Sequence, residues 1–529
     1  MGYYLNPSNE AYKSILKSKI FVDKSELIKF TNDCIGVYDS KNICVSRPRR
    51  FGKTVNLNML AAYYSMGCNS KEIFDNLKIS KDVSYEQHLN KYNVIKINMQ
   101  EALSRSNDIH GMIEYIKKLV LWDFDISYPN VRYFDRDILG CCFSDVYQYS
   151  KKPFIFLIDE WDCVFREYRN DKESQNKYLD FLRDLLKDKD YVALAYMTGI
   201  LPIKKYGTHS ALNMFTEYSM TNSGKIANSV GFTEEEVQEL CEKFNMNTDT
   251  MRYWYNGYHL GRYNLYCSRS VSTAISNEEY DSYWTQTETY EALENYITLN
   301  LYGLNDAVKR LVAGEKIEID PLGFTNDMVT LTSRDDVLTL LVHLGYLGYI
   351  FQTKEVYVPN KEVRDVYVTS MNKSGQWKET VKFIKMSKEL IKLTESKNSE
   401  KVAEIIEQVH RTEIAPIHYN NEQSLRYVVL ISYFYARERY NIIQEMPAGD
   451  GYADIMLIPN FQNPDGIPII VELKCNESPE TAINQIKNKH YYDVLKNYNE
   501  VLLVGISYDK KIKKHECLIE EFSIYNSQQ

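Results

Sequence analysis

The chain has 529 residues, a length that predicts two to four domains rather than a single core. Hydrophobic residues make up 44% and charged residues 26%, which excludes an intrinsically disordered chain. The formal net charge of -9 excludes a protein coated in basic surface, so a nucleic-acid site must be a local cluster of lysine and arginine. Lys373–Lys401 and Lys510–Lys514 are such clusters, although a run of charge is more often a solvated face.

The cysteines point to a reducing compartment. There are ten of them without a C-x-x-C pair, so the spacing predicts neither a zinc site nor a disulfide framework. The first residues lack a basic segment followed by an apolar run, and no apolar stretch is long enough to span a bilayer. We therefore expect a cytoplasmic protein without a membrane partner.

Strand-like and helix-like segments alternate in the first part of the chain. Short apolar runs at 43–46, 94–99, 154–158 and 192–197 predict strands, and the segments 54–64, 110–124 and 178–186 between them predict helices. Such alternation is typical of a parallel sheet with crossover helices. We assign residues 1–230 to this α/β domain.

Two further regions follow. Residues 231–370 read as helices rich in tyrosine and tryptophan, ending in a helix at 335–345 and two short strands, the order of a winged helix. Residues 371–529 begin with a lysine-rich connector and continue as a second α/β unit. Its predicted helices are 422–440 and 479–495, and its predicted strands are 442–446, 452–458, 467–474 and 501–507.

A basic turn, S-R-P-R-R-F-G-K-T, joins the first predicted strand to the first helix. Backbone N–H groups at a helix N-terminus bind phosphate, and Gly52 lets the backbone approach the anion closely. Lys53 would then reach the β- and γ-phosphates, and the Thr54 hydroxyl would hold Mg²⁺. The turn departs from G-x-x-x-x-G-K-T because Arg47 stands in place of the first glycine.

Acidic residues follow the most apolar predicted strand. Asp159 and Glu160 come directly after it, where an ATPase places its Mg²⁺-coordinating aspartate and its water-activating glutamate. Thr198 ends the next strand and could sense the γ-phosphate. Together with the basic turn, these residues predict a site for ATP and Mg²⁺.

A second constellation lies near the C-terminus. Asp454 precedes Glu-x-Lys at Glu472 and Lys474, and residues two apart on a strand share a face. With Asp454 on a neighbouring strand, the carboxylates would bind Mg²⁺, or Mn²⁺, and Lys474 would orient the attacking water. This spacing is that of PD-(D/E)xK nucleases.

The run R-P-R-R-F-G-K-T and several other segments resemble the AAA-ATPase-like proteins found widely in bacteria. The other matching segments are 21–25, 158–162, 198–201, 231–237, 254–258 and 359–363. In this family the missing first glycine is normal, and a C-terminal PD-(D/E)xK nuclease-like domain of restriction-endonuclease fold is typical. The resemblance implies that Arg49 and Arg50 belong to the nucleotide site, and leaves open whether they and Arg47 contact phosphate or shape the loop.

The resemblance also implies two flanking residues in the nuclease-like domain. Glu422 matches an acidic helix residue that supports the metal, and Gln485 matches a glutamine beside the catalytic site. The alternatives are that Glu422 merely favours a helix N-terminus and that Gln485 is solvated.

Three functions fit these patterns. We expect foremost an enzyme in which ATP binding or hydrolysis controls metal-dependent cleavage of nucleic acid, with DNA preferred to RNA. The alternative is a nucleotide-switched module that binds nucleic acid or protein through a catalytically silent nuclease fold. A third is an ATPase that regulates protein assembly. A homo-oligomer is left open, and no single arginine can be chosen to complete a neighbour's ATP site.

Overall fold

A computed structural model describes five stretches of the chain, namely residues 2–203, 212–284, 290–325, 328–413 and 422–524. The contacts within the chain define two compact units. The N-terminal unit comprises Met1–Thr289, Leu301–Gly303 and Glu318–Val363, and the C-terminal unit comprises Tyr290–Asn300, Leu304–Ile317 and Arg364–Gln529. The finer division into 1–230, 231–370 and 371–529 stays a prediction.

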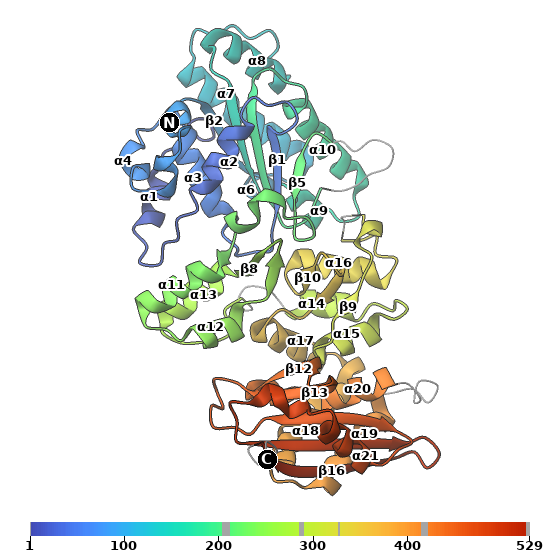
Figure 1. The fold of residues 1–529 in the computed structure, drawn as a ribbon. Coiled ribbons are helices and arrows are strands. Elements are labelled where there is room, and N and C mark those ends of the chain that lie inside the picture. The colour runs from blue at the N-terminus through green and yellow to red at the C-terminus, as the bar shows by residue number, and fades with distance from the viewer. Residues whose placement is uncertain (1, 204–211, 285–289, 326–327, 414–421, 525–529) are drawn as a thin grey trace. The chain divides into compact units, whose positions relative to one another are not determined.

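The N-terminal unit is built around a five-stranded sheet in the order β2-β3-β4-β1-β5 (Figure 1). Every neighbouring pair in it is parallel. The strands are β1 (Asn42–Ser46), β2 (Asn93–Asn98), β3 (Phe154–Asp159), β4 (Val192–Gly199) and β5 (Thr216–Tyr218). All residues of β1, β3 and β4 are buried, as expected of central parallel strands covered on both faces. The predicted parallel α/β sheet is confirmed, whereas β5 was missed because it is only three half-buried residues long.

Helices lie around this sheet (Figure 1). They are α1 (Glu10–Leu16), α2 (Glu26–Cys34), α3 (Lys53–Tyr64), α4 (Lys71–Phe74), η1 (Lys78–Lys81), α5 (Tyr85–His88), α6 (Met99–Ser104), α7 (Ile109–Ser127), α8 (Leu139–Ser150), α9 (Cys163–Glu167) and α10 (Lys172–Leu186). Side chains define where the longer ones begin. Asp108 accepts a hydrogen bond from the Gly111 amide at the start of α7, and Asp171 caps α10 in the same way.

The rest of the N-terminal unit consists of shorter elements. They are η2 (Gly224–Ser229), β6 (Phe232–Thr233), α11 (Glu234–Phe244), α12 (Thr248–Tyr255), β7 (Tyr258–Leu260), β8 (Tyr263–Tyr266), α13 (Ser268–Asn277), η3 (Pro321–Gly323), α16 (Arg334–Leu344), β10 (Gly348–Ile350), β11 (Glu355–Tyr357) and the start of α17 (Lys361–Lys373). A capping box of Ser333 and Asp336 starts α16, and Gly345, with φ of +91°, ends it. The predicted helix and the two short strands after it are therefore present, and the strands pair antiparallel.

A buried carboxylate anchors α17 within this unit. Glu362 is 2% exposed and accepts hydrogen bonds from the amides of Tyr283 and Trp284, at 2.7 and 2.6 Å. The Ser270 hydroxyl donates to the same carboxylate at 2.9 Å. Burial nevertheless raises the pKa of Glu362 to about 7, because the charged form loses more hydration than these donors replace.

We expect Glu362→Gln to remove a pH dependence of local stability. A folded pKa of about 7, above the ordinary 4.5, means that the protonated form is favoured in the folded chain. Its contribution is fully present below pH 4.5 and is lost as pH rises through 7, at a cost of about 3 kcal/mol. Hydrogen exchange of the peptide containing Tyr283 and Trp284, corrected for intrinsic rates, should show more opening at pH 8 than at pH 5. The variant should lack this difference, whereas the exposed control Glu279→Gln should keep it.

The C-terminal unit holds a mixed sheet in the order β12-β13-β14-β15-β16. Its strands are β12 (Tyr440–Ala448), β13 (Gly451–Pro459), β14 (Ile469–Cys475), β15 (Glu500–Asp509) and β16 (Lys514–Ser523). Only β14 and β15 run parallel, and α21 (Pro479–Asn488) with η7 (Tyr491–Leu495) makes the crossover between them. This mixed α/β sheet is compatible with the restriction-endonuclease-like fold predicted for the region.

Helices complete the unit. They are α14 (Tyr290–Ile297), α15 (Leu304–Val312), the remainder of α17, η4 (Gly375–Trp377), α18 (Lys378–Glu395), α19 (Ser399–Glu413), α20 (Glu422–Ser432) and η6 (Phe434–Glu438), while β9 (Ile317–Glu318) lies where the chain passes between the units. Two helices are shorter than predicted. The 422–440 helix changes to 3-10 geometry after Ser432, and His490, with φ of +53°, interrupts the 479–495 helix. Within the described stretches, no helix combines the length and apolar character that crossing a bilayer requires.

Candidate nucleotide and metal sites

A pocket of about 720 Å³ opens beside the carboxyl ends of β1 and β3 and the N-terminus of α3. Almost all predicted nucleotide residues line it, namely Arg49, Arg50, Gly52, Lys53, Thr54, Asp159 and Glu160. Ligands of α/β proteins bind at this edge of a parallel sheet, where loops and helix N-termini converge. The structure therefore brings the basic turn and the acidic strand end together.

Two residues of the turn, Arg50 and Gly52, have a left-handed backbone, with φ of +68° at Arg50. Gly52 has φ of +93° and directly precedes α3, a conformation that costs little only without a side chain. Phe51 is buried and packs edge-on against Tyr258, with ring centroids 5.1 Å apart. The first-turn amides of α3 are thus held at the pocket, as phosphate binding requires.

Lys53 lies deep in the pocket. Its Nζ donates hydrogen bonds to the carbonyls of Arg47 and Pro48, at 2.9 and 2.8 Å. Burial lowers the pKa of Lys53 to about 8, although the carboxylates of Asp162 and Asp159 oppose this shift. A buried ammonium of this kind gains most from an anionic ligand, because phosphate replaces the hydration that burial removes.

Asp159 joins the basic turn to β4. One oxygen of its carboxylate accepts a hydrogen bond from the Thr54 hydroxyl at 2.7 Å, and the other accepts one from the Thr198 hydroxyl at 2.6 Å. Thr198 itself is fully buried and does not line the pocket. Its contact is therefore with Asp159, rather than with the space a γ-phosphate would occupy. The hydroxyl and carboxylate oxygens of Thr54 and Asp159 form a donor set that suits Mg²⁺.

Glu160 faces the pocket from a strained backbone, with φ of +52°. Its carboxylate accepts a hydrogen bond from Arg166 Nη2 at 2.7 Å, and Arg166 Nε lies 3.5 Å from Asp162. Sequence reasoning did not identify Arg166, an arginine of the same chain, as part of this site. The available signal was the four-residue spacing of Asp162 and Arg166 in a helical segment just after the acidic strand end.

Arg47, which replaces the first glycine of the usual motif, points away from the pocket. Its side chain is fully buried, and Nη1 donates to the carbonyls of Ser46 and Tyr218, at 2.9 and 3.0 Å. It thereby ties the end of β1 to the end of β5. Of the three arginines in the turn, Arg47 shapes the loop and the other two reach the pocket.

A second pocket, of about 330 Å³, lies in the C-terminal unit. Asp454 comes from β13, and Glu472 and Lys474 come from the adjacent strand β14, where Ile455 pairs with Val471. The Leu473 amide donates to Asp454 Oδ2 at 2.8 Å, so the two acidic residues lie side by side. The structure thus gathers the predicted D…E-x-K residues in one pocket.

Glu472 is the most constrained group of this pocket. It is 2% exposed, and its Oε1 accepts hydrogen bonds from Lys474 Nζ, at 3.1 Å, and from Gln485 Nε2. Burial and the neighbouring charge of Asp454 raise the pKa of Glu472 to about 7. Its Oε2 is buried without a hydrogen-bond partner among the described residues.

This donor set fits a divalent cation. Two carboxylates that repel each other, one carrying a buried oxygen without a donor, are stabilised by a positive ion between them. Within the described ranges no group of three or more His, Cys, Asp and Glu could hold a metal, so the ligands proposed among the described side chains are these two carboxylates. The side chain of the other predicted metal residue, Glu422, lies outside the described part of α20.

The pocket contains residues that sequence reasoning missed. Arg426 of α20, Tyr452 and Lys489 also line it, and Tyr491 lies beside Gln485, whose Nε2 donates to the tyrosine hydroxyl at 3.1 Å. Arg426 stands four residues after Glu422 on α20, which was the only signal for it. Gln485 contacts both Glu472 and Tyr491, so it is not merely solvated.

Comparisons with known proteins agree with this arrangement. Residues 10–208 match the family model of predicted AAA-ATPases, and residues 420–517 match that of the PD-(D/E)XK nuclease superfamily. A curated protein of Azotobacter chroococcum mcd 1, named for its place in the vnfD 5' region, is 24% identical over 261 residues. The match covers 48% of this chain and 49% of that protein, so the chain spans about half the length of this relative.

The solved structures that match the chain include two from Aeropyrum pernix. The ORC2 protein in ADPNP–ADP complexes matches with 11% identity and a TM-score of 0.31, over 67% of this chain and 96% of that one. The ORC1 protein in complex with DNA matches with 11% identity and a TM-score of 0.24, over 68% and 96%. The two family matches identify a predicted AAA-ATPase domain at residues 10–208, which include most of the nucleotide-pocket residues, and a domain of the PD-(D/E)XK nuclease superfamily at residues 420–517, which include the Asp454–Glu472 pocket.

Proposed function

We propose that this chain binds and hydrolyses ATP in its N-terminal unit, and that the nucleotide controls metal-dependent cleavage of nucleic acid, DNA above all, by its C-terminal unit. The observation that carries the proposal is the convergence of Asp454, Glu472 and Lys474 in one pocket. The nucleotide pocket supplies the second half of the argument.

In the N-terminal pocket, each proposed role follows from position. Lys53 neutralises the β- and γ-phosphates as a point charge at the start of α3, and Thr54 with Asp159 would hold Mg²⁺. Glu160 accepts the proton of the attacking water. Arg166 keeps the Glu160 carboxylate directed at the pocket and is a positioning residue.

In the C-terminal pocket, Asp454 and Glu472 would hold Mg²⁺ or Mn²⁺. A divalent ion bound there would lower the pKa of its water and offset the negative charge of the scissile phosphate. Lys474 orients the attacking water, and its contact with Glu472 limits how far the ammonium can swing. Gln485 also donates to Glu472 Oε1, so Oε2, which has no hydrogen-bond partner among the described residues, is the oxygen that would serve as a metal ligand.

A nucleic-acid substrate is favoured by the charge around these carboxylates. Lys474 and Lys489 line the same pocket, as does Arg426, which also pairs with Glu445 at 2.6 Å, so cations stand beside a two-carboxylate centre. Phosphodiesters need that combination, because the cations bind the backbone phosphates while the carboxylates bind the metal.

The first test is incubation of the full chain with labelled DNA and RNA, with Mg²⁺ or Mn²⁺ and with or without ATP. We expect metal-dependent cleavage, stronger on DNA, whose rate changes with ATP. Binding of nucleic acid without cleavage in any metal would instead identify a silent nuclease fold. ATP hydrolysis without any effect of nucleic acid would favour an ATPase that regulates protein assembly.

If nucleotide controls the nuclease, the two ligands must change each other's affinity. Coupling between sites is reciprocal for binding and typically amounts to about 1–3 kcal/mol, so DNA should alter ATP affinity by roughly 5–150-fold. The measurement is ATP titration with and without DNA, in the Asp454→Ala variant to prevent cutting. Identical ATP affinities, together with cleavage that is indifferent to Lys53→Ala, would show two independent modules on one chain.

A further inference from the structure

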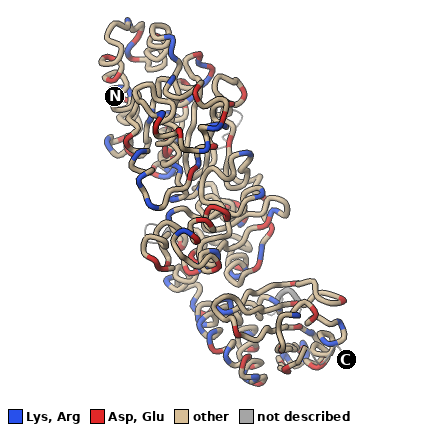
Figure 2. Tube along the Cα trace, turned by 60° about the vertical axis from the view of Figure 1, so that its left-hand side comes forward, with Lys and Arg blue, Asp and Glu red and all other residues tan. Residues whose placement is uncertain are grey.

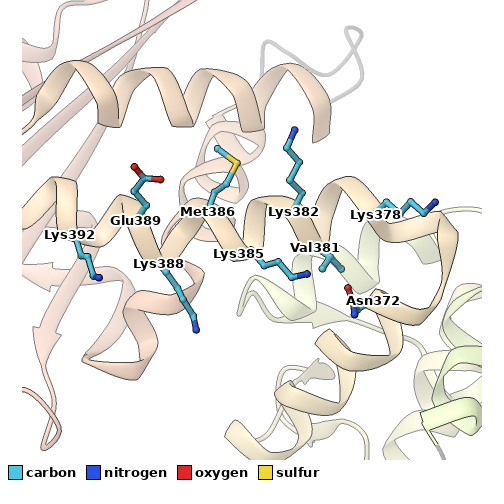
Figure 3. Close-up of a pocket in the computed structure, with 9 residues that line it drawn as sticks. All are labelled: Asn372, Lys378, Val381, Lys382, Lys385, Met386, Lys388, Glu389 and Lys392. Carbon is cyan, nitrogen blue, oxygen red and sulfur yellow. The ribbon is translucent and has the colours of Figure 1, made fainter.

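The outward face of α18 carries a row of lysines that neither candidate site uses. Lys378, Lys382, Lys385, Lys388 and Lys392 are all exposed and follow one another at intervals of three or four residues. Figure 3 shows them along one helix, with Lys382 reaching to one side of its axis and Lys388 and Lys392 to the other. We call these five residues the α18 lysine stripe. They line a shallow groove of about 670 Å³ together with Asn372, Val381, Met386 and Glu389.

The stripe is the solvent side of an amphipathic helix. The buried residues of α18 are Thr380, Val381, Phe383, Ile384, Ser387, Leu390, Ile391 and Thr394. This buried face packs against α19, α20 and η6. Apart from Lys388, whose Nζ lies 4.3 Å from the centroid of the Tyr435 ring, the lysines therefore contribute little to the core beyond the contacts of their stems.

The charge of the stripe is only partly balanced. Glu395, one of three glutamates on α18, turns inward to Arg439 at 2.8 Å and accepts from the Tyr440 hydroxyl at 2.8 Å. Glu379 lies 4.0 Å from Lys382, and Glu389 lines the groove. Five lysines against these two carboxylates leave an excess of three positive charges. Acidic and basic residues are interspersed over most of the chain (Figure 2), so this excess is local.

The spacing of the lysines places like charges next to one another on the helix surface. Lys378 and Lys382 are four residues apart, as are Lys388 and Lys392, and like charges at this spacing destabilise a helix. A helix that is merely solvated gains from glutamate four residues before lysine, as in the 2.7 Å pair of Glu173 and Lys177 on α10. The repulsion along the stripe would be relieved by a polyanion lying across it.

We propose that the α18 lysine stripe binds the phosphate backbone of DNA without reading its sequence, and delivers it to the Asp454–Glu472 pocket. The inference rests on the proposed nuclease function. From Lys378 to Lys392 the helix rises by about 21 Å, which spans roughly six nucleotides of one strand. A row of this length suits an extended polyanion, whereas a small anion needs cations that converge on one point.

The helix that carries the stripe is linked to the pocket through α20, which contacts the buried face of α18. α18 packs against α20, and Leu425 and Arg426 of α20 line the pocket that holds Asp454 and Glu472. Both features therefore belong to the C-terminal unit and share one supporting helix. Lysine offers a flexible point charge rather than a planar fork, which fits contact with phosphates and not with base edges.

The test is salt-dependent binding of a short labelled DNA duplex by the full chain carrying Asp454→Ala. The added changes are Lys378→Gln, Lys385→Gln and Lys392→Gln, which keep the helix propensity and remove three charges. We expect the slope of log affinity against log salt concentration to fall by roughly 2–3, and the affinity at low salt to fall at least about tenfold. The matched control replaces three lysines of the same unit that lie outside both lysine clusters and outside the pocket, Lys316, Lys487 and Lys496, by glutamine.

Each outcome decides the inference. A loss of DNA affinity confined to the stripe variant supports the proposal. An equal loss in the control variant, or no loss in either variant, overturns the proposal. Stripe-dependent binding of a polyglutamate peptide, of anionic vesicles or of RNA alone also overturns it. Cleavage by the unchanged chain is measured in parallel. If DNA binding depends on the stripe but the unchanged chain does not cleave DNA, the nuclease function is rejected and DNA binding by the stripe is retained. If the unchanged chain cleaves DNA and the stripe variant binds DNA with unaltered affinity, only DNA binding by the stripe is rejected.

Discussion

Replacing Lys53 by alanine is expected to lower ATP hydrolysis by at least about 10²–10³-fold, because one buried cation of a charge-stabilising site is removed. The ammonium sits at the start of α3 and is held by the Arg47 and Pro48 carbonyls. ATP should also cease to protect the variant against heating. A ligand at a hundred times its dissociation constant stabilises by about 2.7 kcal/mol, and this increment disappears when binding is lost.

Glu160→Gln separates binding from turnover. The amide keeps the size of the side chain and can still accept from Arg166, but it cannot take a proton from water. We expect this variant to retain heat protection by ATP and to lose hydrolysis. Lys152→Ala, at an exposed lysine of the same unit, serves as the control and should behave as the unchanged chain does. Hydrolysis at the ordinary rate in both Lys53→Ala and Glu160→Gln would contradict the assignment of this pocket.

The second large effect is expected at the metal pocket. Asp454→Ala and Glu472→Gln should each lower cleavage of DNA by roughly 10²–10³-fold, because the ion contributes several kcal/mol of charge stabilisation. A chelator should abolish cleavage by the unchanged chain, and added Mg²⁺ or Mn²⁺ should restore it. Titration with Mn²⁺ should show a site that both variants lose.

Asp465→Ala is the matched control, because Asp465 is an exposed carboxylate of the same unit that lies outside the pocket. It should bind Mn²⁺ and cleave DNA as the unchanged chain does. Lys474→Gln should bind Mn²⁺ but cleave slowly, since it removes the group that orients the water and leaves both carboxylates. Cleavage by Asp454→Ala at the ordinary rate would refute the assignment of this centre.

Much of both sites could be predicted from the sequence because their parts are local. A glycine before a helix start, a lysine and a threonine in its first turn, and acidic residues after an apolar strand are short patterns. The backbone conformation of each segment selects its residue types, as Gly52 at φ of +93° illustrates. Likewise, the two-residue period of a strand put Glu472 and Lys474 on one face before any packing was known.

Tertiary packing decided the side-chain contacts that short sequence patterns do not encode. Arg47 was left as either a phosphate ligand or a loop residue, and its contact with Tyr218, 171 positions later, places it in the core. Arg166 meets Glu160, and Gln485 meets Glu472, only because a turn or a crossover brings them back to the strand ends. Sequence spacing says little about such approaches, since many folds of the same segments are sterically allowed.

The sequence by itself thus determined the two α/β regions and the order of most of their strands along the chain, and it supplied most of the residues proposed for both sites, because local backbone preference and hydrophobic period act within a few residues. Only the tertiary structure decided that β5 completes the first sheet beside β1 and that the Thr198 hydroxyl donates a hydrogen bond to Asp159. The tertiary structure also decided which face of α18 packs on the core and that its lysines face the solvent. Those outcomes depend on burial and charge summed over distant segments, which no single segment encodes.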